Sequence, residues 1–256
     1  MSGDHSGAYS LYQPGTSVLH RLPAHLKIIA ALLTIIAIVA TPRERFWAFG
    51  LYALGVGALL GIARIAPRRI ARRLVLEIPF LIFAAALPFI ALGERTQVLG
   101  VSMSIDGLYG AWNIVVKGTL GVLISTVLAS TTSIRDLLAG LQRLRVPDLL
   151  IQIMSFMARY AVVVADQMRR MRIARESRAF SARHIGHAKV VARSGAALFI
   201  RSYERGERVH LAMLARGYNG RLPALADAPT SARQWAIALS APVLTAAVAA
   251  AAIMGR

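Results

Sequence analysis

Five long apolar segments alternate with polar segments along the 256 residues. A helix needs about 20 mostly apolar residues to cross the roughly 30 Å hydrocarbon core of a bilayer. The segments are residues 26–40, 46–63, 74–92, 108–130 and 235–254. The first is shorter than the others, so it must draw on flanking residues, tilt or thin the bilayer locally. The pattern predicts an all-α, polytopic membrane protein with about five transmembrane helices.

The distribution of charge predicts the orientation of these helices. The chain carries 30 Lys and Arg against 12 Asp and Glu, a formal net charge of +18. With the N-terminus inside, 25 of the 30 basic residues fall on the cytoplasmic side. Short basic segments stay in the cytoplasm during insertion, so this orientation is favoured. We therefore expect a multi-pass protein of the cell membrane with its N-terminus and residues 131–233 in the cytoplasm.

A polar block at residues 131–233 divides the chain, since it holds 18 basic and seven acidic residues. The expected domains are an N-terminal cytoplasmic segment, four transmembrane helices, a cytoplasmic helical region and a C-terminal transmembrane helix. Their bounds are 1–25, 26–130, 131–233 and 234–256. Within the block, side-chain spacing predicts a helix at 134–144 capped by Thr132 or Ser133, a longer helix capped by Asp148, and a third at 188–216 that stops at Gly217.

The second of these helices has an apolar first half, residues 149–165, that allows two interpretations. A sixth membrane crossing is one, because only Gln152, Ser155 and Arg159 interrupt the apolar run. A central Arg costs about 2.5 to 3.5 kcal/mol on insertion, and the extra crossing would place residues 169–233 outside. The favoured interpretation is a helix at the cytoplasmic interface, with its apolar face toward the bundle and its Arg-rich end in the cytoplasm.

Several kinds of chemistry are absent from the sequence. Without Cys there is no disulfide, thiolate metal site or cysteine nucleophile. No Gly-x-x-x-x-Gly-Lys-Ser/Thr pattern occurs, so we expect the chain neither to bind nor to hydrolyse ATP, and we expect no enzyme activity and no cofactor. His184 and His187 could share a helical face, but no His has a convincing set of co-ligands, so no metal site is predicted.

Two ionisable residues within or near the apolar segments are candidates for a functional role. Lys117 lies near the middle of 108–130, where it could bond across the bundle, contact another subunit or extend its ammonium toward the interface. Glu77 lies near the cytoplasmic start of 74–92 and is expected to reach the interface. Their different depths argue against a direct ion pair.

Motifs from residue 131 onward carry a family resemblance. They read TTS at 131–133, DLL at 136–138, LRVP at 144–147, RY at 159–160, LFIRSYERGERV at 198–209 and MLARGY at 213–218. They resemble the transmembrane T component of energy-coupling factor (ECF) transporters, and are most similar to its cobalt-importer version, the CbiQ family. The resemblance covers nearly the whole chain, including Ser17, His20 and Lys27 before the first apolar segment.

The resemblance implies two contact sites for ATPase subunits. In that family, Ala-Arg-Gly motifs at the ends of two cytoplasmic coupling helices dock on two ATP-binding subunits. The second motif is intact here as Ala215, Arg216 and Gly217, and the first corresponds to Ser177, Arg178 and Ala179. Ala179 takes a left-handed helix stop less readily than Gly. A guanidinium at a helix C-terminus is favoured by the helix dipole and offers a planar set of donors.

The implied function is that of a coupling subunit of a cobalt importer. The implied partners are a CbiO-like ATPase dimer and a CbiM-like substrate-binding membrane subunit, with or without a CbiN-like small subunit, in a lipid bilayer. One alternative is a T component for nickel or a vitamin such as biotin. Another is a membrane-anchored scaffold or enzyme whose basic domain binds nucleic acid or anionic lipid. An aromatic content of 7% and the lack of acid/base constellations give the latter little support, so no nucleic-acid partner is expected.

Overall fold

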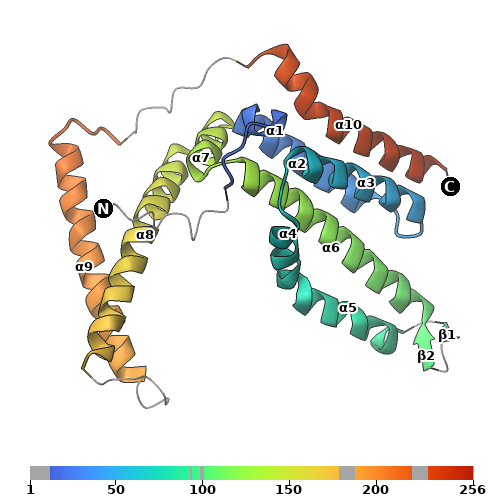
Figure 1. Cartoon of the computed structure of the whole chain (residues 1–256), viewed down its shortest axis with the longest axis horizontal. Coiled ribbons are helices and arrows are strands. Elements are labelled where there is room, and N and C mark those ends of the chain that lie inside the picture. The colour runs from blue at the N-terminus through green and yellow to red at the C-terminus, as the bar shows by residue number, and fades with distance from the viewer. Residues whose placement is uncertain (1–11, 93, 99–100, 179–187, 221–229, 256) are drawn as a thin grey trace. The chain divides into compact units, whose positions relative to one another are not determined.

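The computed structural model describes residues 12–92, 94–98, 101–178, 188–220 and 230–255, which are almost entirely helical (Figure 1). The elements are α1 Val18–Arg21, α2 Ala24–Ala40, α3 Phe46–Ile62, α4 Pro67–Leu74, the 3-10 helix η1 Val75–Glu77, α5 Ile78–Ile90, β1 Arg95–Val98, β2 Val101–Ser104, α6 Ile105–Thr131, α7 Ile134–Arg143, α8 Asp148–Glu176, α9 Ala188–Leu214 and α10 Ala232–Met254. The all-α prediction is confirmed.

The chain forms two compact units. The first, called the bundle below, comprises Tyr9–Gly140 and Asp227–Arg256 and contains α1 to α6, most of α7, and α10. The second, called the α8–α9 unit, contains those two helices and lies within Leu141–Ala226. Sequence alone places a boundary near here, at 131, but the four-part division remains a prediction.

Four helices in the described residues are long and apolar enough to cross a membrane: Pro67–Ile90, Ile105–Thr131, Asp148–Glu176 and Ala232–Met254. The apolar helices α2 and α3 have 17 residues each. All five predicted segments coincide with helices of the bundle, whose outer surface exposes large apolar side chains such as Ile36, Leu54, Phe80 and Leu244. A surface of this kind is covered by lipid in a membrane protein. The helix α8 meets the same length and hydropathy criteria, so its interfacial placement stays a prediction.

The core of the bundle lies between α2, α3, α6 and α10. Its buried residues are Ile38, Ala48, Phe49, Tyr52, Val56, Leu120, Ile124 and Ala252. Tyr52 is 2% exposed, and its hydroxyl lies 2.8 Å from Thr41 Oγ1 and 3.3 Å from the backbone oxygen of Thr245. A buried phenol needs such a partner. Tyr52 thereby links α3 to the end of α2 and to α10.

Several short elements of the bundle, among them α4, β1 and β2, are not predicted from the sequence. Helix α4 begins with Pro67 at its first turn, a position that tolerates proline because its N–H would have no partner there. Strands β1 and β2 form an antiparallel hairpin between α5 and α6, pairing Arg95 with Ser104. Ser104 then caps α6 by accepting a hydrogen bond from the Gly107 N–H at 3.3 Å. The hairpin therefore determines where α6 begins.

The turn between α2 and α3 is linked to the start of α6 by charge. Arg43 forms ion pairs with Glu44 at 3.2 Å and with Asp106 at 2.9 Å. The hydrogen bond to Glu44, together with the pairing to Asp106, raises the pKa of the Arg43 guanidinium. These side chains are exposed, so the pairs orient the turn more than they stabilise the fold.

Candidate functional site

Helices α8 and α9 lie side by side in opposite directions, close together where α8 ends and α9 begins (Figure 1). Arg175 Nη1 donates to Ser194 Oγ at 3.3 Å and joins these two ends. Other arginines of α8 pair within the helix: Arg170 with Asp166, and Arg172 with Glu176 at 2.8 Å. Such exposed pairs contribute only about 0.3 to 0.5 kcal/mol each, so they are features of a solvated helix surface.

The first predicted motif follows the last turn of α8. The Ser177 N–H and its Oγ both donate to the Ile173 carbonyl oxygen at 2.9 Å, and the Arg178 N–H donates to Arg175 O at 3.1 Å. The side chains of Ser177 and Arg178 are exposed. Ala179 lies outside the described residues. Arg178 is therefore placed where the last carbonyls of α8 favour a positive charge.

The second predicted motif ends α9 in a left-handed turn. Gly217 has φ +81°, a conformation that costs a residue with a side chain about 1 to 2 kcal/mol. The Gly217 N–H donates to Leu214 O and the Tyr218 N–H to Met213 O, both at 3.0 Å. This is the hydrogen-bond pattern of a glycine-terminated helix, so the predicted stop is confirmed. Ala215 and Arg216 lie in the turn and are exposed.

A buried glutamine ties the second motif to the start of α8, a contact that the sequence did not predict. Gln152 is 7% exposed; its Nε2 donates to Gly220 O at 2.9 Å and its Oε1 accepts from the Tyr218 hydroxyl at 2.5 Å. These partners fix the orientation of the amide group. The Tyr218 ring also meets His210 edge to face, 6.5 Å between ring centres. We call the contacts of Gln152 with Tyr218 and Gly220 the Gln152–Tyr218 clasp.

The two motif arginines therefore lie at opposite ends of the helix pair. Arg178 follows the end of α8, and the clasp holds the turn of Arg216 near the beginning of α8. The 24 residues from Gln152 to Glu176, where α8 ends, correspond to about 36 Å of helix. Within the described part of the chain, neither arginine forms an ion pair. Both side chains are exposed, at widely separated points of the helix pair.

Lys117 and Glu77 bond to different parts of the bundle. Lys117 Nζ donates to Val39 O at 2.8 Å and Thr41 O at 2.9 Å, the last carbonyls of α2, so this side chain bonds across the bundle. Glu77 is 7% exposed and accepts from Thr119 Oγ1 at 3.0 Å. Its carboxylate packs against α6. That Glu77 reaches the membrane interface stays a prediction. The two residues act as links between helices.

No group of three or more His, Asp or Glu that could hold a metal ion occurs in the residues that the structure describes. His20 contacts Ser17 Oγ at 2.7 Å and Gln13 O at 3.0 Å through its two ring nitrogens. His25 is buried beside Trp235. His184 and His187 lie outside the described residues.

Comparison with known proteins gives a consistent result. Residues 15–225 match the family described as CbiQ, cobalt transport protein. An uncharacterized protein of Methanocaldococcus jannaschii, MJ1089, is 32% identical over 105 residues, 41% of this chain and 39% of the relative. The cobalt transport protein CbiQ of Rhodobacter capsulatus is 30% identical over 169 residues, 66% of this chain and 68% of the relative. The energy-coupling factor transporter transmembrane protein EcfT of Bacillus subtilis is 25% identical over 225 residues, 82% and 83% of the two chains. The match thus spans about two fifths of the M. jannaschii relative's length and most of the other two.

Proposed function

This chain belongs to the CbiQ family. From that premise we propose that it is the transmembrane component of an ECF-type transporter and couples partner ATPase subunits to a substrate-binding membrane subunit. ATP is bound and hydrolysed by the partners, and this chain is a non-catalytic subunit that transmits their motion. The proposed cytoplasmic parts are the N-terminus and residues 131–233.

The position of Arg178 and Arg216 is the observation that carries this proposal. Two exposed guanidiniums at opposite ends of one helix pair match a pair of related ATPase subunits, each contacting one end. A guanidinium offers several N–H donors in a plane, which suits carboxylates or helix-end carbonyls of a partner. The proposed docking residues are Ser177, Arg178 and Ala179 at one end, and Ala215, Arg216 and Gly217 at the other.

The short polypeptide connection between α7 and α8 links the docking helices to the bundle. Helix α7 is anchored in the bundle by Leu138, which is 7% exposed, and residues 144–147 connect it to α8. Arg145 in this connection has φ +61°, a conformation typical of turns. A displacement of α8 by the ATPases is therefore passed on to α7 through a short connection.

Cobalt is the proposed substrate. It is supported by the family description and by the name of the R. capsulatus relative. The similarity to EcfT, which extends over 82% of this chain, favours a second candidate: a T component that serves a different substrate, such as nickel or a vitamin. Because capture of the substrate falls to a separate membrane subunit in this proposal, the two candidates differ in that partner and share the coupling role.

Assembly with the ATPase subunits tests the proposal. We expect the double variant Arg178→Glu, Arg216→Glu to stay in the membrane but to lose its ATPases on co-purification, since each lost arginine contact costs about 2 kcal/mol, or roughly thirtyfold in affinity. The matched control is Arg169→Glu, Arg193→Glu, which changes the charge equally at exposed positions of the same two helices. Retention of the ATPases by the first pair would exclude docking through these arginines.

A further inference from the structure

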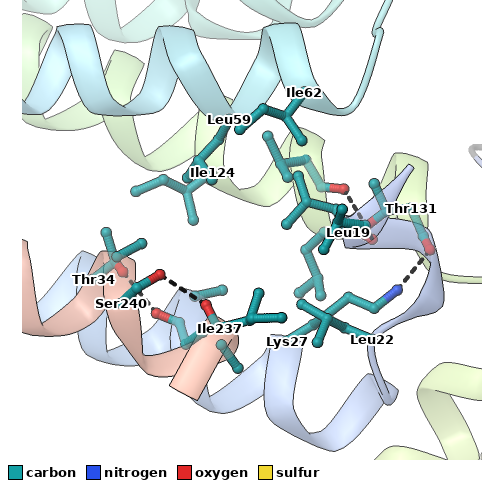
Figure 2. A pocket seen from close by; sticks show the side chains of 17 residues that line it. Leu19, Leu22, Lys27, Thr34, Leu59, Ile62, Ile124, Thr131, Ile237 and Ser240 are labelled. Atoms are coloured by element: carbon teal, nitrogen blue, oxygen red, sulfur yellow. Dashed lines mark hydrogen bonds between the residues drawn. The ribbon is translucent and has the colours of Figure 1, made fainter. Parts of the chain in front are cut away.

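The bundle contains an apolar cavity of about 390 Å³ bordered by α1, α2, α3, α6 and α10 (Figure 2). Leu19, Leu59, Ile62, Ile124 and Ile237 are among the side chains that form its wall. Ligand pockets in proteins have volumes of about 300 to 1,000 Å³. An apolar protein cavity of about 150 Å³ already stays dry and binds benzene. The cavity is therefore large enough for part of a hydrocarbon chain.

The hydroxyl groups in the wall of the cavity form hydrogen bonds within their own helices. Figure 2 shows Thr34, Thr131 and Ser240, and each hydroxyl donates to a carbonyl oxygen three or four residues earlier in its own helix, at 2.8 Å. Their hydrogens are thus used within the helix, and methyl and methylene groups remain to face the cavity. Water needs two to four polar partners to occupy such a space. The wall suits a hydrocarbon chain better than water.

Lys27 is the charged side chain of this wall. It is 9% exposed, and its Nζ donates to Thr131 O at 2.8 Å. An ammonium group carries three N–H donors, so this bond uses one of them. Asp136 acts on Lys27 electrostatically, but it accepts a hydrogen bond from Ser133 Oγ, and no ion pair joins Lys27 to an acid in the described chain. A buried cation of this kind favours an anionic ligand.

A second, more polar cavity of about 710 Å³ adjoins the first, and the two share Val18 and Ile62. It is bordered by the segment from Gln13 to Ser17, by His20 and by the end of α3 up to Arg64. The ring nitrogens of His20 are already hydrogen-bonded within this segment. Arg64 is exposed and forms no ion pair among the described residues. An apolar cavity thus continues into a polar one that carries a cation.

We propose that the two cavities bind one phospholipid with an anionic headgroup. Its acyl chain occupies the apolar cavity, its headgroup lies in the polar cavity near Arg64, and Lys27 adds a second positive charge beside the chain. Ile237 and Ser240 of α10 line the apolar cavity and are exposed, so it is accessible from the lipid around the bundle. The orientation predicted from the basic residues places Arg64 on the cytoplasmic side, where bilayers carry their anionic lipids.

Lipid retention by the purified full-length chain in detergent micelles tests the proposal. Dioleoyl-phosphatidylglycerol and dioleoyl-phosphatidylcholine are added in equal amounts, and bound lipid is counted by native mass spectrometry. We expect the anionic lipid to be retained about fivefold better or more, since a basic residue near a headgroup gives about that factor. Arg64→Gln should lower this preference, with Lys27 retaining part of it, and Arg68→Gln, an exposed position on α4 that borders neither cavity, should leave it unchanged.

Filling the apolar cavity tests the position of the acyl chain. Ala241 borders the cavity, and Ala247 is exposed on the same helix and does not. Ala241→Leu should lower retention at least about tenfold, because the new side chain displaces several methylene groups, whereas Ala247→Leu should leave retention unchanged. Equal retention of the two lipids by the unaltered chain overturns the proposal. Unchanged lipid retention by a folded Ala241→Leu chain also overturns the proposal. If Ala241→Leu does not fold, the surface variant Arg64→Gln still decides the test.

Discussion

Replacing Tyr218 by Phe tests whether the Gln152–Tyr218 clasp holds the Arg216 turn against α8. The substitution keeps the ring and its edge-to-face contact with His210 but removes the hydroxyl that lies 2.5 Å from Gln152 Oε1. Gln152 is 7% exposed, so water reaches its amide poorly. The variant therefore loses a hydrogen bond and leaves a buried acceptor without this donor.

The size of the effect follows from these contacts. A lost hydrogen bond with a buried, unsatisfied acceptor costs about 1 to 3 kcal/mol. Local opening of the turn should become easier by the same amount, so amide exchange there should be roughly 5- to 150-fold faster. The reporters are the Gly217 and Tyr218 N–H groups, which donate to Leu214 O and Met213 O. Hydrogen exchange of the full chain in micelles, followed by mass spectrometry of peptides covering residues 215–220, measures it.

Tyr203→Phe is the matched control. Tyr203 lies on α9, is 60% exposed and makes no hydrogen bond through its hydroxyl in the described residues, so its loss should leave exchange at 217–218 unchanged. Unchanged exchange in Tyr218→Phe, or equal acceleration in both variants, would refute the clasp.

Three further predictions concern the bundle, the end of α9 and the orientation. Lys117→Met should destabilise the bundle by about 2 to 3 kcal/mol, because the charged hydrogen bonds of Lys117 to the end of α2 are lost, and should lower the unfolding midpoint in detergent. The control Lys189→Met, at an exposed position of α9, should leave the midpoint unchanged, and equal midpoints for the two variants would contradict this role of Lys117. Gly217→Ala should destabilise the end of α9 by about 1 kcal/mol, because φ is positive at this position. Gly195→Ala, where a new side chain meets open space, should instead stabilise α9 by about 0.5 to 1 kcal/mol, and amide exchange measures both effects. In this cysteine-free chain, an impermeant thiol reagent outside intact cells should label Gln97→Cys and spare Arg68→Cys; the reverse labelling would contradict the predicted orientation.

The apolar segments predict the helices of the bundle because a run of about 20 apolar residues has few other stable structures. The predicted ends of these helices are less accurate, since the polar residues that cap a helix lie outside the apolar pattern. Ser104 and Ser231 start α6 and α10 three residues before the predicted 108 and 235. The missed elements are short and contain no long apolar run: the strands have four residues each, and α4 has eight residues, four of them arginine.

In the candidate site, features set by neighbouring residues could be predicted from the sequence, and contacts between residues far apart in the sequence could not. The stop at Gly217 is predictable because a glycine in that position is a local signal. The clasp is not, since Gln152 and Tyr218 lie 66 residues apart and only folding brings them together. Lys117 likewise bonds to carbonyls more than 70 residues away. In both cases the available signal was a polar residue interrupting an apolar run, which marks a buried partner without identifying it.

The rate of cobalt uptake tests the coupling role most directly. The complete complex, with its ATPase and substrate-binding subunits, is reconstituted in proteoliposomes, and uptake of radioactive Co²⁺ is followed after ATP is supplied. With Arg178→Glu, Arg216→Glu the initial rate should fall at least tenfold, because two docking contacts of about 2 kcal/mol each are lost. The rate with Arg169→Glu, Arg193→Glu should match that of the unaltered chain. Undiminished uptake in the first variant would contradict coupling through these two arginines.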